Sequence, residues 1–327
     1  MTSEMPLWEP SAKILSNSPM ALFRKTAEGI AGRPLATYDD LHAWSVENRE
    51  AFWTAVWDDC GVVGEKGGTA LENGALMLEA RFFPEGRLNF AENLLKKSGP
   101  GDALVFRGED KAADRWSWDD LRARVSKIQQ ALSAMGIGEG DRIAAMMPNM
   151  PETVALMLAA TSLGAIWSSC SPDFGEQGVF DRFGQIEPKL FIACDAYWYA
   201  GKLQDVSAKV EAVAVKLGVP VVVAHYAGDA DALAAALPDG RTLDALMAPY
   251  AAKPLSFTRL PFRHPVYILF SSGTTGVPKC IVHSAGGTLL QHLKEHRLHC
   301  GLVEDERLFY FTTCGWMMWN WLVSGLA

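Results

Sequence analysis

Apolar runs alternate with helix-like segments through the middle of the chain. We expect strands at 102–107, 141–147, 165–169, 189–194 and 219–224. Between them, apolar residues recur at helical spacing, and we expect helices at 117–136, 151–164, 176–185 and 202–217. Strands that alternate with helices indicate a mainly parallel sheet with helices packed on it. The sequence therefore predicts an α/β fold.

A helical region is predicted ahead of this domain, over residues 1–95. Thr37 and Asp40 have the spacing of a capping box, which opens a helix. Aromatic and aliphatic residues then follow at helical spacing: Leu41, Trp44, Phe52, Trp53, Val56 and Trp57. Such a stripe is more often buried core than a platform for a ligand, so we expect a packed N-terminal helical extension.

A loop of glycines and hydroxyl residues lies between apolar runs at 266–270 and 280–282. Its residues are Ser271, Ser272, Gly273, Thr274, Thr275, Gly276, Val277, Pro278 and Lys279. Glycine lets backbone N–H groups approach phosphate oxygens, hydroxyls add donors, and lysine adds a compact positive charge. The pattern predicts a polyphosphate site in a loop that joins two strands and moves over a nucleotide. A plain surface turn is the alternative.

This loop differs from a P-loop, because Pro278 precedes the lysine and Cys280 follows it. It resembles the phosphate loop of the adenylate-forming superfamily, which includes acyl-CoA synthetases, luciferases and adenylation domains. The superfamily often has glycine where this chain has Cys280. The surrounding chain is similar to acyl-CoA synthetases that act on a short keto acid, and 87–95 resembles the segment that leads into their main domain.

The resemblance implies an ATP-dependent acid–CoA ligase whose substrates are acetoacetate, ATP with Mg²⁺, and CoA. It implies an N-terminal helical region over 1–95 and part of the adenylating domain over 96–327. Lys279, Thr274 and Thr275 are the implied catalytic residues. ATP and pyrophosphate are expected to bind Ser271, Ser272, Gly273, Thr274, Thr275, Gly276 and Lys279.

Two further segments match substrate sites of the family. The turn at 168–174 follows a predicted strand, and the resemblance makes Ser171, Asp173, Phe174 and Lys202 the CoA-binding candidates, although Ser-Pro-Asp replaces the family's Phe-Gly-Gly. A solvated lysine at a helix start is the alternative for Lys202. A predicted strand at 307–314 leads to Gly315, after which Trp316, Met317 and Met318 are expected to wall the acyl pocket. An ordinary aromatic core is the alternative there.

Three histidines and a cysteine could share one helix face after the loop. His292, His296, His299 and Cys300 have a spacing that a zinc site could use. No carboxylate partner is evident beside them, and the resemblance assigns this helix a packing role. We therefore expect no metal at this helix.

Charge and cysteine content narrow the class of protein further. The net charge of -8 argues against a general nucleic-acid or membrane-surface binder. Six cysteines without a Cys-x-x-Cys pair favour reduced thiols and a cytoplasmic protein. The N-terminus has no secretory signal pattern, and the longest apolar stretch, 153–167, is too short to span a bilayer.

The resemblance covers only the first half of the family's length, and the chain ends inside an apolar segment at 320–327. We therefore expect a fragment that lacks the later nucleotide motif, the ribose-binding aspartate and the C-terminal domain with its catalytic lysine. Alone it is expected to be inactive. Two alternatives stay open: a ligase for acetate, propionate or butyrate, and a non-catalytic remnant that binds nucleotide or pyrophosphate.

Overall fold

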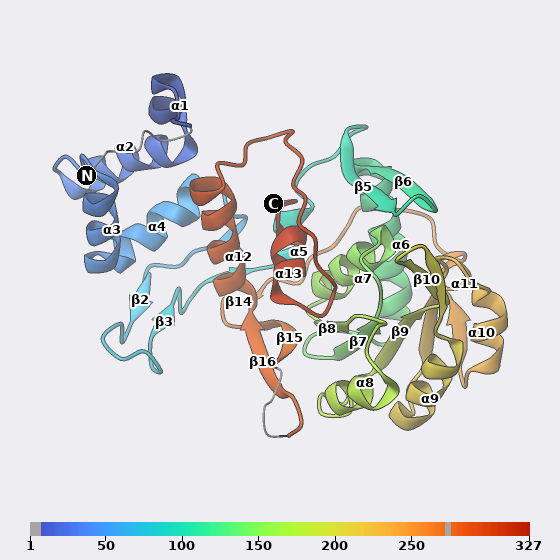
Figure 1. Ribbon diagram of the computed structural model, residues 1–327. Helices are drawn as coiled ribbons and strands as arrows, with labels where there is room; N and C mark the ends of the chain where they lie inside the picture. The colour runs from blue at the N-terminus through green and yellow to red at the C-terminus, as the bar shows by residue number, and fades with distance from the viewer. Residues whose placement is uncertain (1–7, 272–275) are drawn as a thin grey trace.

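The computed structural model describes residues 8–271 and 276–327 (Figure 1). Its N-terminal region is mostly helical and lies to one side of the main sheet, beside the later helix α12 (Ala285–Lys294). The elements of this region are α1 (Ala12–Asn17), α2 (Pro19–Ala31), α3 (Tyr38–Glu47), α4 (Arg49–Asp59), β1 (Gly64–Glu65), β2 (Leu71–Glu72), β3 (Arg81–Phe82), β4 (Arg87–Leu88) and α5 (Phe90–Leu94). The predicted helical extension is therefore confirmed.

Aromatic side chains form the core of this region. Thr37 and Asp40 make the reciprocal capping-box bonds at the start of α3, as the sequence predicts. Trp44 and Trp57 are buried, and the Trp57 ring lies 5.0 Å from that of Phe83 between centroids. The stripe is thus core, as expected, and its burial attaches α3 and α4 to the rest of the molecule.

A seven-stranded sheet forms the centre of the main domain, with the strand order β13-β12-β9-β7-β8-β15-β16. Its strands are β7 (Arg142–Met146), β8 (Ile166–Cys170), β9 (Leu190–Cys194), β12 (Val221–Ala224), β13 (Gly240–Thr242), β15 (Pro265–Ser271) and β16 (Lys279–Ser284). All neighbours run parallel except β15 and β16, which form an antiparallel hairpin. The predicted α/β class with a mainly parallel sheet is confirmed.

Helices cover both faces of this sheet, which explains why β8, β9 and β12 are buried throughout. α6 packs on α7, α8 packs on α9, and Figure 1 shows the two pairs on opposite sides of the strands. The helices are α6 (Trp118–Ala134), α7 (Pro151–Ser162), α8 (Glu176–Phe183), α9 (Ser207–Leu217), α10 (Ala230–Ala236), α11 (Leu243–Met247), α12, the π-helix η1 (Glu295–His299) and α13 (Met317–Ser324). Among the described residues, no helix is long and apolar enough to cross a membrane.

Besides β1 to β4, five further strands of the described chain lie outside the central sheet: β5 (Asp102–Gly108), β6 (Ala112–Ser117), β10 (Ala196–Tyr199), β11 (Lys202–Asp205) and β14 (Leu260–Pro261). Two of them correct the sequence prediction. β6 pairs with β5 where no strand was expected, and β11 occupies the start of the helix predicted at 202–217. That helix begins only at Ser207, because Lys202–Asp205 hydrogen-bonds to β10 as an antiparallel hairpin.

The strand predicted at 307–314 is wrong. This segment is extended chain outside any sheet, drawn as a long red coil in Figure 1. Its run of aromatic residues has high β-propensity, but a strand also needs a neighbouring backbone to pair with. In the described part of the chain it has none, and Phe309 and Phe311 are 81% and 85% exposed.

Candidate functional site

Three predicted site segments meet at the carboxyl edge of the central sheet. β8 ends at Cys170 and β15 at Ser271, and Tyr267 pairs with Trp167 across these parallel strands. Four residues further along each strand are Ser271 and Ser171, which therefore leave the sheet side by side. The chain places β8 and β9 on opposite sides of β7, and ligands of open α/β sheets bind where the strand order reverses in this way.

The turn at Gly315 lies against this edge as well. The Ser169 hydroxyl donates a buried hydrogen bond of 2.7 Å to the carbonyl of Cys314. A Cβ atom added at Gly315 would lie 3.5 Å from both the Cα of Cys170 and the backbone nitrogen of Ser171. The turn that precedes the predicted acyl-pocket residues is therefore in direct contact with the turn predicted to bind CoA.

The predicted acyl-pocket residues begin α13. Trp316 is 66% exposed and Met317 is 41% exposed, while Met318 is half-buried. The buried indole of this cluster is Trp319, whose Nε1 donates to the Oδ1 atom of Asn149 at 2.9 Å. An aromatic core therefore accounts for Trp319 and does not account for Trp316, which faces solvent beside Gly315.

The predicted phosphate loop connects β15 to β16. Ser271 pairs with Lys279 at the end of this hairpin next to the loop, so both predicted strands are confirmed. The loop residues Ser272, Gly273, Thr274 and Thr275 lie outside the described residues. On the return side, Gly276 and Lys279 are exposed, and the carbonyl of Pro278 accepts a 2.9 Å hydrogen bond from the Gln185 amide.

Side chains from distant elements hold the turn at 171–174. The Ser171 hydroxyl donates to the Oδ2 atom of Asp173 at 2.7 Å, and the Tyr197 hydroxyl donates to the Oδ1 atom of the same carboxylate. The Lys209 ammonium, from α9, donates to the carbonyl of Pro172 at 2.6 Å. Beyond the turn, the Arg182 guanidinium lies 4.1 Å from the centre of the Phe174 ring.

Lys202 lies on the β10–β11 hairpin, which also carries Tyr197. It is exposed at the start of β11, next to Gly201, whose N–H donates to the Glu109 carboxylate at 2.7 Å. The residues of this region that do contact the turn are Tyr197 and Lys209, and sequence reasoning missed both. No local spacing connects them to the turn, although Tyr197 stood in the conspicuous run Tyr-Trp-Tyr.

The histidines after the loop pack against α13. His292 Nδ1 lies 2.9 Å from the Ser324 hydroxyl, and His296 Nε2 lies 2.9 Å from the Trp321 carbonyl. Burial, together with the neighbouring His296 and His283, lowers the pKa of His292 to about 3. These rings are therefore neutral packing groups, as the resemblance implies. Across residues 8–271 and 276–327, no group of three or more His, Cys, Asp or Glu residues could hold a metal ion.

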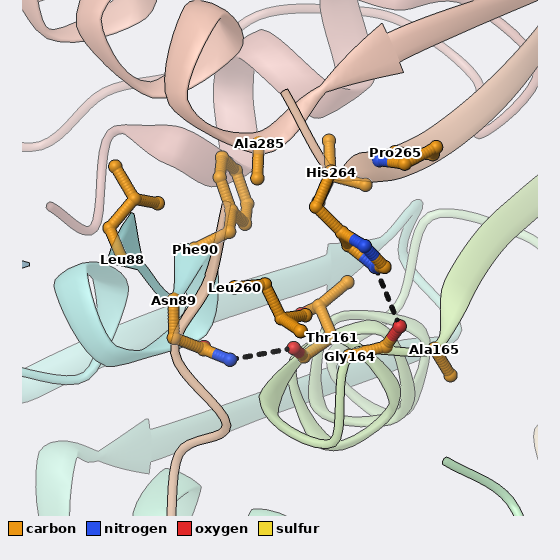
Figure 2. A pocket seen from close by; sticks show the side chains of 11 residues that line it. Leu88, Asn89, Phe90, Thr161, Gly164, Ala165, Leu260, His264, Pro265 and Ala285 are labelled. Carbon is orange, nitrogen blue, oxygen red and sulfur yellow. Dashed lines mark hydrogen bonds between the residues drawn. The ribbon is translucent and has the colours of Figure 1, made fainter. Parts of the chain in front are cut away.

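Two cavities of the described chain lie away from the carboxyl-edge turns. One, of about 10 Å³, lies between the end of the N-terminal region and the main domain (Figure 2). It is no larger than a water site. Beside it, the Asn89 amide donates to the carbonyls of Thr161, Ser162 and Thr258 at 3.0, 3.1 and 2.8 Å, which joins 87–95 to α7. The other, of about 400 Å³, is lined by Asp229, Asp231 and Asp244, which would repel an anionic nucleotide.

Comparisons with known proteins agree on one family. The family described as AMP-binding enzyme matches residues 95–327, and the acetyl-coenzyme A synthetase N-terminus matches residues 38–94. The chain is 68% identical to an acetoacetyl-coenzyme A synthetase from Rhizobium meliloti, covering 100% of this chain and 50% of that protein. It is 40% identical to a malonamoyl-CoA synthetase from Penicillium aethiopicum, covering 98% of this chain and 46% of that protein.

A solved structure gives the same picture. The acetoacetyl-CoA synthetase from Streptomyces lividans superposes with a TM-score of 0.91 at 36% identity, covering 99% of this chain and 50% of that chain. The chain thus spans about half the length of the relatives it matches.

Proposed function

The chain belongs to the AMP-binding enzyme family, and on that premise we propose that it carries the phosphate and thiol sites of an ATP-dependent acid–CoA ligase for acetoacetate. One observation carries the proposal beyond family membership. The adjacent parallel strands β8 and β15 bring the turn at 171–174 and the Ser271–Lys279 hairpin to the same sheet edge. A ligase of this kind needs a polyphosphate site and a thiol site next to one another, because one acyl group passes through both reactions.

The reaction has two steps. In the first, the acid's carboxylate attacks the α-phosphorus of Mg²⁺-bound ATP, and pyrophosphate leaves with the electron pair of the broken P–O bond. Lys279 and the hydroxyls of Ser271, Ser272, Thr274 and Thr275 would stabilise the negative charge that develops on pyrophosphate. In the second, the CoA thiol, losing its proton, attacks the acyl carbonyl carbon, and AMP leaves.

The remaining site assignments belong to this proposal. CoA would contact Ser171, Asp173 and Phe174, with Lys202 further along, and the acid would lie against Trp316, Met317 and Met318. Residues 1–95 would form a helical region and residues 96–327 part of the adenylating domain. The partners would be small molecules, and the protein would be cytoplasmic.

Acetoacetate is the acid best supported, because two of the relatives described above carry its name. Malonamate is the second candidate, since a relative 40% identical is named for malonamoyl-CoA. Both acids carry a second carbonyl group two bonds from the carboxylate carbon, so they present the same polar pattern to a pocket. Acetate, propionate and butyrate lack that carbonyl, so a comparison with them tests whether the pocket recognises it.

The test uses a completed ligase, in which residues 1–327 are joined to the second half of the Rhizobium meliloti relative. We expect acid-dependent exchange of pyrophosphate into ATP, strongest with acetoacetate and weaker with malonamate, acetate, propionate and butyrate. The Rhizobium meliloti enzyme, assayed beside it, is the positive control. A completed ligase that binds ATP but exchanges no pyrophosphate with any acid would make the chain a non-catalytic nucleotide-binding protein.

A further inference from the structure

The turn at 171–174 contains no glycine and depends on side chains for its shape. Its central residue is Asp173, and both oxygens of that carboxylate are occupied. The Ser171 hydroxyl donates to one oxygen from within the turn, at 2.7 Å. The other oxygen accepts from the hydroxyl of Tyr197, which is 24 residues away in sequence. The Tyr197 bond is therefore the one that ties the carboxylate to the rest of the fold.

Tyr197 is itself firmly held. It lies in β10, directly after the end of β9, and only 8% of it is exposed. Burial raises the pKa of its hydroxyl, and the hydrogen bond to Asp173 and the charge of that carboxylate raise it further. The hydroxyl therefore keeps its proton throughout the physiological range and can always donate.

A second anchor reaches the turn from the other side. The Lys209 ammonium donates to the Pro172 carbonyl at 2.6 Å, which uses one of its three donors. Arg182 lies against Phe174 at the end of the turn. Two cations thus stand beside a turn that is held at a side chain from β10 and at its backbone from α9, which suits a cosubstrate that carries several phosphates.

We propose that Tyr197, acting through Asp173, is a positioning residue that holds the 171–174 turn in the shape that receives the phosphorylated thiol CoA. This inference rests on the proposed function and concerns only its thiol step. A turn without glycine reaches a required shape only if other groups hold it there, and small displacements of a substrate-positioning segment are costly to the reaction. Tyr197 need not touch CoA for this role.

The test compares Tyr197→Phe with the unmodified completed ligase in two assays. Pyrophosphate exchange with acetoacetate requires no CoA, whereas thioester formation does. Removing a partly buried hydrogen bond to a charged group should raise KM for CoA about tenfold and leave pyrophosphate exchange within about twofold. Tyr226→Phe is the matched control, because this half-buried tyrosine makes no hydroxyl hydrogen bond to any described residue.

A double variant that combines Tyr197→Phe with Asp173→Asn distinguishes positioning through Asp173 from a general loss of packing. Asp173→Asn alters the exposed end of the same hydrogen bond and opens no cavity, so it should raise KM for CoA by itself. If Tyr197 acts through Asp173, the double variant should be little worse than Asp173→Asn alone, because residues in one network are not additive. Additive effects, an unchanged KM for CoA in Tyr197→Phe, or equal losses in both assays would overturn the inference.

The two proposals fail in distinguishable ways. If the unmodified completed ligase shows no acid-dependent pyrophosphate exchange, the proposed function is wrong and this inference falls with it. If the ligase is active in both assays and the Tyr197→Phe variant matches it in KM for CoA, only the positioning role is wrong.

Discussion

The turn after β8 and the hairpin after β15 leave adjacent parallel strands, yet different contacts hold them. The turn at 171–174 is fixed by side chains from β10 and α9, through Tyr197 and Lys209. The described ends of the hairpin are held by backbone pairing of Ser271 with Lys279 and by the side chain of Gln185, whose amide donates to the Pro278 carbonyl and accepts a long contact of 3.9 Å from the Cys280 thiol. β16 is largely exposed along its length, whereas Ser171 and Tyr197 are buried.

This difference matches the two proposed steps. A thiol cosubstrate is to be received by a surface that is already formed, which lowers the entropy lost when it binds. Among the proposed pyrophosphate contacts, Lys279 is exposed at the hairpin end and can meet the phosphates directly. Although both segments lie at the same sheet edge, we therefore expect changes in the hairpin to affect the first step, the attack on ATP. Changes around the turn should affect the thiol step.

The largest effect is expected from Lys279→Ala in the completed ligase. Removing the hairpin's charged donor should lower acetoacetate-dependent pyrophosphate exchange by about 100-fold or more, the usual size for losing a donor to developing charge. Lys253→Ala, at another exposed lysine, is the control. An unchanged exchange rate would mean that Lys279 does not bind the phosphates and that the hairpin does not serve the first step.

Lys209→Met tests the contact that holds the turn from α9. It keeps the length of the side chain and removes the bond to the Pro172 carbonyl. Because Lys209 is partly exposed, we expect about a fivefold rise in KM for CoA, below the range for buried charged hydrogen bonds, with pyrophosphate exchange unchanged. The exposed Lys13→Met variant is the control. A larger loss in exchange than in thioester formation would mean that α9 supports both steps alike.

Trp316→Gly tests whether the exposed indole limits the chain length of the acid that the pocket accepts. If Trp316 walls the pocket, each added methylene that fits should gain about 0.8 kcal/mol, or about fourfold in kcat/KM, over a series of longer keto acids. Trp8→Gly, a similarly exposed tryptophan in the N-terminal region, is the control. A chain-length profile identical to that of the unmodified ligase would leave Trp316 without a role in acid choice.

The smallest effect is expected from Gln185→Ala, which removes the hydrogen bond to the Pro278 carbonyl and the long contact with the Cys280 thiol. One neutral, exposed hydrogen bond contributes little, so pyrophosphate exchange should fall by about twofold and KM for CoA should stay constant. Gln130→Ala, which removes a similar amide bond to the Ala251 carbonyl, is the control. A loss as large as that of Lys279→Ala would show that the hairpin depends strongly on its contact with Gln185, in the segment that follows α8.

Local pattern was sufficient for most of the fold. Capping boxes at Thr37 and Ser117 begin helices where expected, and buried apolar runs became β8, β9, β12 and β15. These features depend on residues a few positions apart, so composition and spacing carry them. The predicted strand at 307–314 had the right residue types and lacked only a partner, which no local pattern specifies.

The candidate site was predictable only where one short segment carries it. The Ser271–Lys279 stretch is contiguous, and so is the run that follows Gly315. The turn at 171–174 depends on Tyr197 and Lys209, whose contacts cross 24 and 37 residues of sequence. The hairpin β10–β11 that presents Tyr197 was in part expected to be a helix. Long-range contacts of this kind arise from topology, so spacing along the chain did not indicate them.

The extended segment around Phe309 and Phe311 has a practical consequence for anyone handling this chain. Two exposed aromatic residues in unpaired backbone are a preferred target for chymotrypsin, whereas the sheet and its buried helices resist cleavage. One cut there would separate Trp316 and α13 covalently from the hairpin, while the Ser169–Cys314 hydrogen bond and the buried Trp319 keep the pieces together. A nicked sample would therefore run as one species on gel filtration and as two bands on a denaturing gel.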